Sequence, residues 1–194
     1  MSLNASGRAT SAAKYRDVPL GGSLSAHFTP RADGATLVTS TEPLGAYPTR
    51  LTDRLLHWAA TEPEHTLAAK RAQGGDWRRL SYREALHGAR CIAQALIEMK
   101  LSADRPVAIL SDNDLEHLLL TLGAMLAGVP VAPISAAYST VSQDYGKLKH
   151  ILGVLTPGLV FASGASAYGR AITASVPADV PVVLTSAGWK AAAP

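Results

Sequence analysis

One segment of the chain, Arg105 to Tyr138, constrains the possible folds more than any other. It opens with a short apolar run at Pro106–Leu110 and passes through a polar cluster. Apolar residues at helical spacing follow as far as Gly128, and a second apolar run covers Val129–Ile134. This order predicts strand, helix, strand. Such a connection is typical of a parallel sheet, because the chain must travel back along the sheet before the next strand begins.

Helical patterns and short apolar runs alternate through the rest of the chain. Ser81 and Glu84 have the spacing of a capping box and predict the start of a helix whose apolar stripe is expected to lie on the sheet. Other helices are expected at 51–61, 142–155 and 165–175, with strands at 35–39, 65–71, 77–80, 159–162 and 180–184. The alternation predicts an α/β fold, with a layered, mainly parallel sheet and flanking helices.

The composition divides the chain into three expected regions. Residues 1–16 are rich in Ser, Ala and Arg without any acidic residue, which predicts a disordered tail. Residues 17–50 are rich in Gly and Pro and are expected to form an extended lead-in. Residues 51–194 carry the α/β subdomain, whose final Ala-Ala-Ala-Pro shows no sign of a completed domain.

Charge and cysteine content exclude several classes of protein. The net charge of +3 comes entirely from Arg8, Lys14 and Arg16, so the remainder is neutral and no nucleic-acid partner is expected. The most apolar window, Leu118–Ile134, is short for a bilayer span, so no membrane association is expected. The single cysteine, Cys91, favours a reducing, cytoplasmic location and is expected to be a structural thiol.

The motifs of catalysis and phosphate binding are missing from the sequence. A dinucleotide-binding turn would need Gly-x-Gly-x-x-Gly where Ser111–Asp114 stands, and Gly153 and Gly158 lack the lysine of a P-loop. The six histidines are scattered without metal-ligand spacing. No catalytic residue and no metal site are therefore predicted.

Three features stay open between a binding role and an ordinary structural one. The acidic cluster Asp112–Asp114 follows a strand, where it could contact a ligand or cap the next helix. The small residues Ser135, Ala136 and Ala137 would let a ligand approach the backbone, or they form a turn before a helix. Arg170 is the one charged residue between Lys149 and Asp179, and it either meets an anion or covers a solvated helix face.

Several phrases resemble the amino-terminal part of the acyl-adenylate-forming (ANL) enzymes, and most closely the feruloyl-CoA synthases and related aromatic acid-CoA ligases. The phrases keep their order and spacing from Tyr15 to about Leu184. They are YRDVPLGG, YPTRLTDRLLHWA, WRRLSYREALHGARCIAQAL, the run from RPVAILSDNDLEHLLL to SQDYGKLKHIL, and TPGLVFA.

The resemblance implies an enzyme that activates an aromatic carboxylic acid with ATP and Mg²⁺ and passes the acyl group to coenzyme A. The family's phosphate loop, ribose and metal carboxylates and lysine-bearing domain have no counterpart in these residues, so this chain alone is expected to be inactive. The resemblance places Ser135, Ala136 and Ala137 at the border of the coenzyme A channel and Arg170 near the nucleotide phosphates.

Two functions from different classes follow. The first is an amino-terminal fragment of such a ligase, with self-association expected through the apolar face that would meet the rest of the enzyme. The second is a stand-alone, non-catalytic binding or interaction module with the same fold.

Overall fold

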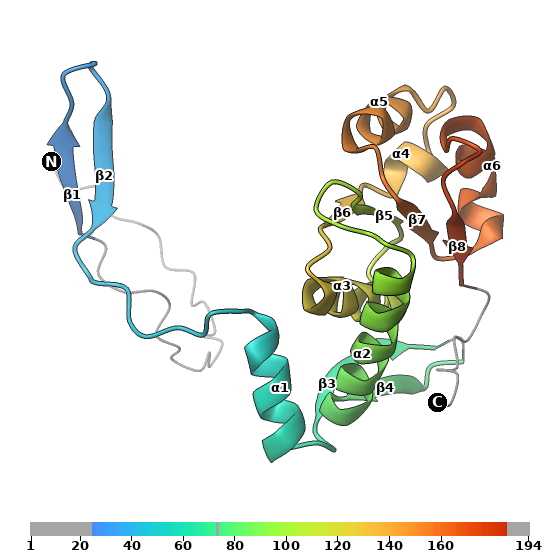
Figure 1. The fold of residues 1–194 in the computed structure, drawn as a ribbon, viewed down its shortest axis with the longest axis horizontal. Coiled ribbons are helices and arrows are strands. Elements are labelled where there is room, and N and C mark those ends of the chain that lie inside the picture. The colour runs from blue at the N-terminus through green and yellow to red at the C-terminus, as the bar shows by residue number, and fades with distance from the viewer. Residues whose placement is uncertain (1–24, 73, 186–194) are drawn as a thin grey trace, which may run out of the picture. The chain divides into compact units, whose positions relative to one another are not determined.

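The computed structural model describes residues 25–72 and 74–185, and it divides between Tyr47 and Pro48 into two units that are considered separately (Figure 1). The disordered tail expected at residues 1–16 lies outside the described residues. None of the helices in the described ranges is both long and apolar enough to cross a membrane.

The first unit contains one antiparallel hairpin, formed by β1 (Ala26–Pro30) and β2 (Thr36–Ser40). The register places Phe28 opposite Val38, and both side chains are more than half exposed. The sequence predicted only the second strand, since AHFTP has too few apolar residues to show a period. No residue of either strand is buried.

The second unit is built around a four-stranded parallel sheet with the strand order β6-β5-β7-β8. Its strands are β5 (Val107–Leu110), β6 (Val131–Ile134), β7 (Leu159–Ala162) and β8 (Val182–Leu184). Every residue of the two central strands is buried, which explains why they read as continuous apolar runs. The predicted α/β class with a parallel sheet and flanking helices is confirmed.

The second unit contains the helices α1 (Thr52–Thr61), α2 (Tyr82–Glu98), α3 (Leu115–Ala127), α4 (Ala137–Thr140), α5 (Gly146–Leu155) and α6 (Ala165–Ser175). Of these, α3 covers one face of the sheet, and α5 and α6 cover the other (Figure 1). Val107, Ile109 and Phe161 point to the face covered by α3. The alternate residues Ala108 and Leu110 point to the face covered by α5 and α6.

The helix α2, whose start was predicted from Ser81, packs mainly along α3 rather than on the sheet. The two helices approach so closely that a Cβ on Gly123 would lie 2.6 Å from Cγ2 of Ile92. Only the end of α2 reaches the sheet face, where Leu96 joins the core beside Ile109. The predicted position of α2 on the sheet was therefore wrong for most of its length, because α3 already occupies that face.

A second hairpin, β3 (Thr66–Arg71) and β4 (Trp77–Ser81), leads directly into α2. The predicted capping box is confirmed: Ser81 Oγ accepts from the Glu84 N–H at 3.2 Å, and the Ser81 N–H donates to the Glu84 carboxylate at 2.8 Å. Leu80 is buried with α1 and α3. Leu51, directly before α1, is exposed, and Thr52 at the start of the helix is buried.

The helix predicted from Ser142 begins later, at Gly146. Ser142 and Asp144 instead form a side-chain turn, in which Ser142 Oγ accepts from the Tyr145 N–H and Asp144 accepts from the Gly146 N–H, both at 3.1 Å. Tyr145 takes a left-handed conformation with φ of 54°. Polar side chains that bond to the nearby backbone compete with the helix, and here they delay it.

Candidate functional site

The carboxyl ends of the parallel strands bring four hydroxyl residues to one edge of the sheet. Ser135, Ser111, Ser163 and Thr185 directly follow β6, β5, β7 and β8 respectively. The register pairs Leu110 with both neighbouring strand ends, so these residues stand side by side along the edge. Ligands in open parallel sheets gather at this edge. The sequence contained the signal, since each strand run ends in Ser or Thr.

The turn between β5 and α3 is held by its own polar groups. Ser111 is 7% exposed and its hydroxyl donates to the Asp112 carbonyl at 2.8 Å. Asp114 is the cap of α3 and accepts from the Leu115 N–H at 2.7 Å. His117 Nδ1 lies 3.3 Å from the Asp112 carbonyl. Capping, the structural alternative for the acidic cluster, is confirmed for Asp114.

Tyr168 of α6 reaches the same edge and is only 2% exposed. Burial raises the pKa of the Tyr168 hydroxyl, and the nearby Asp112 charge raises it further. Hydrogen bonding with Ser163 and with the Asp112 main chain lowers that pKa, but by less. The Tyr168 hydroxyl therefore lies beside Ser163, which follows β7, and Asp112, in the turn after β5. The sequence did not single out Tyr168, because its partners are distant along the chain.

The segment predicted to border a ligand, Ser135–Ala137, forms the turn into the short helix α4. The Ser135 carbonyl accepts from the Tyr138 N–H at 3.0 Å, and Ala136 packs against the core while Ser135 and Ala137 are exposed. The structural alternative, a turn before a helix, is thus confirmed. The exposed small residues still leave the backbone accessible, so the binding role stays a prediction.

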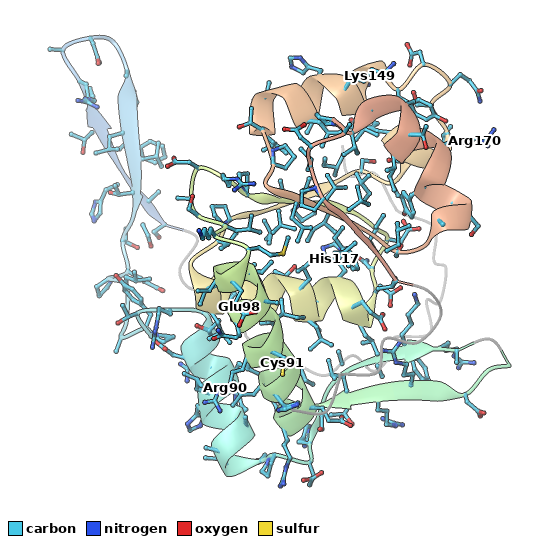
Figure 2. All side chains as sticks on the ribbon, turned by 45° about the vertical axis from the view of Figure 1, so that its right-hand side comes forward. Arg90, Cys91, Glu98, His117, Lys149 and Arg170 are labelled. Carbon is cyan, nitrogen blue, oxygen red and sulfur yellow. The ribbon has the colours of Figure 1, made fainter. Side chains whose placement is uncertain are left out.

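Arg170 lies on the outer side of α6, exposed to solvent (Figure 2). Two residues along a helix turn the side chain by about 200°, so it points away from Tyr168. The contact of α4 with α6 places Arg170 and Ala137 on neighbouring helices, but the described residues show no hydrogen bond or ion pair between Arg170 and Ser135–Ala137. Cys91 is exposed on α2, 3.8 Å from His87 Nε2, and contributes nothing to the core.

Two ion pairs connect the β3–β4 hairpin to the start of α3. Lys70 Nζ lies 2.8 Å from the Asp114 carboxylate, and Arg78 pairs with the nearly buried carboxylate of Glu116. Partial burial would raise the pKa of Asp114. The interactions with Glu116, Lys70 and the Leu115 N–H outweigh burial and hold that pKa below its usual value. The sequence could not show these pairs, since their members are far apart along the chain.

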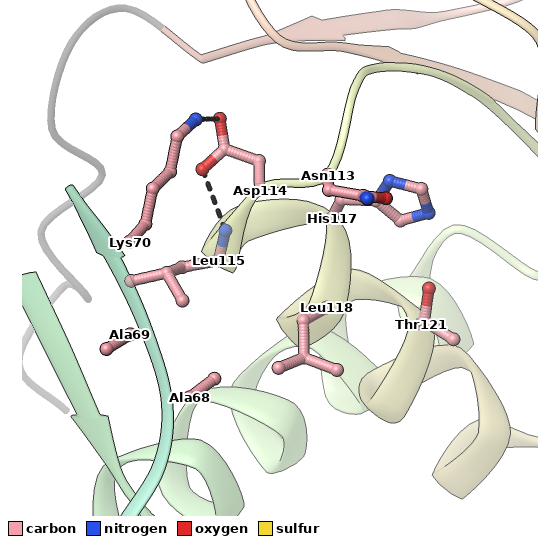
Figure 3. A pocket seen from close by; sticks show the side chains of 9 residues that line it. All are labelled: Ala68, Ala69, Lys70, Asn113, Asp114, Leu115, His117, Leu118 and Thr121. Carbon is pink, nitrogen blue, oxygen red and sulfur yellow. Dashed lines mark hydrogen bonds and ion pairs between the residues drawn. The ribbon is translucent and has the colours of Figure 1, made fainter. Parts of the chain in front are cut away.

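A cleft of about 380 Å³ opens between β3 and α3 (Figure 3). The Lys70–Asp114 ion pair lies at one end of it. One wall is formed by Ala68 and Ala69 together with Lys70, and the remaining lining residues come from the turn before α3 and from the first two turns of that helix. These are Asn113, Asp114, Leu115, His117, Leu118 and Thr121.

The donor set at the sheet edge does not fit a magnesium triphosphate on its own. It offers hydroxyl groups and one outward-facing arginine, whereas a triphosphate needs several cations or a cradle of N–H groups. In the described part of the chain no three His, Cys, Asp or Glu side chains come close enough to hold a metal ion. A site for ATP would need groups beyond those that the described residues bring together.

These observations define a parallel α/β domain whose ligand edge is lined with hydroxyl groups. The model of the AMP-binding enzyme family matches residues 55–191, which is most of the chain. The chain therefore belongs to the AMP-binding enzyme family. None of the curated protein sequences matches it.

Solved structures of several ligases and synthetases share the fold. The fatty acyl-adenylate ligase of L. pneumophila is 19% identical with a TM-score of 0.57. A structure described as a long-chain fatty acid CoA ligase of Rhodopseudomonas palustris is 23% identical with a TM-score of 0.57. The nonribosomal peptide synthetase FmoA3 is 21% identical with a TM-score of 0.60.

The alignments cover 70%, 73% and 78% of this chain but only 23%, 34% and 15% of those proteins. At these identities the similarity shows the fold alone. The chain thus spans about a third or less of the length of the solved structures that it resembles.

Proposed function

We propose that this chain is the amino-terminal part of an ATP-dependent aromatic acid-CoA ligase of the feruloyl-CoA synthase type. The observation that carries the proposal is the family match over residues 55–191, together with the parallel sheet expected of that part. In the full enzyme, the acid would become an acyl-adenylate with release of pyrophosphate. Its acyl group would then pass to the thiol of coenzyme A with release of AMP.

The residues of this chain would serve as scaffold and as one wall of the site. Tyr168, buried beside Ser163 and Asp112, would help to hold the turn after β5 against the end of β7. Ser135, Ala136 and Ala137 would border the coenzyme A channel, where exposed small residues let a ligand approach the backbone. Arg170 would meet the nucleotide phosphates, since a guanidinium can pair with two phosphate oxygens.

The chain by itself would not adenylate an acid. Electrostatic stabilisation of developing charge usually supplies the largest part of such catalysis. One exposed arginine cannot supply it. An ATP–pyrophosphate exchange assay with ferulate and Mg²⁺ tests this directly: the expected result is no exchange above a protein-free control, and measurable turnover by this chain would contradict the proposal.

The choice of an aromatic acid rests on the resemblance and needs its own test. The coding DNA beyond the Pro194 codon should continue in frame into a glycine-rich phosphate loop and a lysine-bearing domain. The longer product should then release AMP faster with ferulate and coenzyme A than with palmitate and coenzyme A. A preference for palmitate would leave the ligase class intact and reject the aromatic substrate. A cytoplasmic location is part of the same proposal, in line with the single cysteine.

A stand-alone interaction module is the second candidate. It is favoured by the core, because residues within 48–185 bury three apolar clusters without further chain. A stop codon directly after Pro194 would support it. For either candidate, the exposed Val183 and Leu184 of edge strand β8 would promote self-association, which light scattering would detect as a concentration-dependent mass.

A further inference from the structure

Two cations of the β3–β4 hairpin match two carboxylates of α3. Lys70 and Arg78 stand directly opposite each other in the register of the hairpin, so their side chains share one face. Lys70 Nζ lies 2.8 Å from the Asp114 carboxylate (Figure 3), and Arg78 pairs with Glu116. Like charges directly opposite each other destabilise a pair of strands. Here each cation has a carboxylate partner on α3, which offsets that repulsion.

Both carboxylates belong to the amino-terminal end of α3. Asp114 is the N-cap: its carboxylate accepts from the Leu115 N–H at 2.7 Å, and its carbonyl accepts from the Leu118 N–H at 3.0 Å. Glu116 is the second residue of the helix and is 6% exposed. Negative charge at this end of a helix is also favoured by the helix dipole. The two ion pairs therefore hold α3 where the turn after β5 joins it.

The turn after β5 depends on this end of the helix. Ser111 directly follows the buried strand and is 7% exposed, so the sheet fixes the first end of the turn. Asp112 and Asn113 are exposed and belong to no apolar cluster of the described residues. The Asp112 carbonyl lies 3.3 Å from His117 Nδ1, and that residue is itself part of α3. The position of the turn at the ligand edge therefore follows from that of Asp114.

Two other strand-end turns of the sheet lack this support. The helices α4 and α6 follow β6 and β7, and neither has a side-chain cap. No ion pair within 25–72 and 74–185 reaches either of these turns. The turn after β5 thus differs from both in being held by a hairpin from another part of the chain.

We propose that Lys70 and Arg78 are positioning residues for the ligand edge of the sheet. Through the two carboxylates of α3 they keep the turn Ser111–Asp114 in the place where it borders a bound substrate. The part that concerns the substrate rests on the proposed function. Neither cation contacts the substrate. A turn that leaves this place lowers the fraction of molecules able to bind, and the apparent affinity falls with that fraction.

A simpler role for the ion pairs would be to hold the hairpin alone. Leu80 is 8% exposed and packs with Leu55 of α1 and Leu119 of α3, so the hairpin keeps an apolar anchor when Lys70 loses its charge. The two roles differ in which backbone N–H groups become accessible. Positioning predicts that those of the turn and the start of α3 do, and the simpler role predicts only those of the hairpin.

Hydrogen–deuterium exchange of the full chain separates the two roles, because it reports local opening. Lys70→Met should speed exchange over residues 112–118 about two- to fivefold, the range of one exposed ion pair, and leave residues 159–162 of β7 unchanged. Lys70→Arg keeps the charge and should exchange like the unsubstituted chain. Arg79→Met is the matched control, since Arg79 points to the other face of the hairpin and has no ion pair among the described residues.

Arg78→Met should act in the same direction and more strongly, about tenfold or more, because Glu116 stays buried without its cation. If this variant does not fold, Lys70→Met decides the question alone. Faster exchange confined to residues 66–81 would overturn the proposal. An equal rise at 159–162, or the same effect from Arg79→Met, would overturn it as well.

The consequence for the substrate is tested in the longer product that the proposed function requires. Lys70→Met should raise the KM for ferulate, ATP or coenzyme A about twofold or more and leave kcat nearly unchanged, whereas loss of folded protein lowers kcat and leaves KM unchanged. Lys70→Arg should restore the KM. Unchanged KM values for all three substrates would overturn the role in binding. If the unsubstituted longer product releases no AMP, the ligase proposal itself fails, and the exchange experiment still decides whether the hairpin positions the turn.

Discussion

The two antiparallel hairpins have nearly the same size and opposite environments. In β1–β2 no residue is buried, and Phe28 and Val38 stand exposed across from each other. In β3–β4 one face is fixed to helices by Leu80 and by the ion pairs of Lys70 and Arg78. Since a two-stranded hairpin is marginal by itself, the difference teaches that packing on helices decides which hairpin contributes to stability.

The largest expected effect tests the apolar contact. Leu80→Ala removes an 8% exposed side chain from the cluster with Leu55 and Leu119, and it should lower the free energy of unfolding by about 2–4 kcal/mol. Urea denaturation followed by circular dichroism measures it. Val38→Ala in β2 is the matched change and should stay within about 0.5 kcal/mol. Similar losses at both positions would contradict the comparison.

The next effect concerns the inward ion pair. Arg78→Ala leaves the nearly buried Glu116 carboxylate without its cation, which should cost about 1–3 kcal/mol. Arg31→Ala in the exposed hairpin should cost little. The double variant Arg78→Met with Glu116→Leu should recover much of the loss, because replacing both members of a buried pair removes the uncompensated charge. Failure of this rescue in urea denaturation would show that Arg78 acts through packing alone.

A third prediction compares the serines that end the two hairpins. Ser81→Ala removes the cap of α2 and should cost about 1 kcal/mol. Ser40 also accepts a backbone hydrogen bond, from the Glu42 N–H at 3.1 Å, but it starts no helix. Ser40→Ala should therefore change the unfolding temperature less than Ser81→Ala does. A larger fall in unfolding temperature for Ser40→Ala than for Ser81→Ala would contradict this prediction and show that the first hairpin contributes to stability.

The smallest effect is a pH dependence. The pKa of Asp114 is held below its usual value, so the carboxylate contributes stability above the pKa of the unfolded chain. That contribution is lost as pH falls through the folded pKa. Asp114→Asn should flatten the loss of stability on acidification by less than about 1 kcal/mol, as expected for a partly exposed pair. Thermal unfolding between neutral and acidic pH measures this change. If stability depends on pH equally in Asp114→Asn and in the unsubstituted chain, the ion pair with Lys70 does not contribute as expected.

Local sequence signals predicted much of the second unit. The strand at 159–162 and the helix at 165–175 occur with the predicted bounds, and the capping box at Ser81 is present. These elements are set by interactions within a few residues or by complete burial of a short run. The first strand of the exposed hairpin was missed, because it has no apolar period.

The candidate site was less predictable than the fold. The sequence marked Asp112–Asp114 and Ser135–Ala137 as strand-end segments, and both lie at the carboxyl edge. It could not identify Tyr168, Lys70 or Arg78, whose roles depend on partners distant in the chain. The sequence singled out Arg170 because no other charged residue lies between Lys149 and Asp179. That observation does not show in which direction the side chain points from its helix.

The sequence by itself determined the strand–helix–strand unit at 105–138, the α/β class and the family. The spacing of apolar residues is a local property of the sequence, and it predicts strands that alternate with helices. A parallel sheet is the arrangement that suits this alternation. Only the tertiary structure decided that α2 lies along α3, that Tyr168 joins two strand ends, and that one hairpin is fixed while the other is exposed. Those outcomes depend on contacts between residues far apart in the chain, where surface shape and charge pairing select partners that no local pattern encodes.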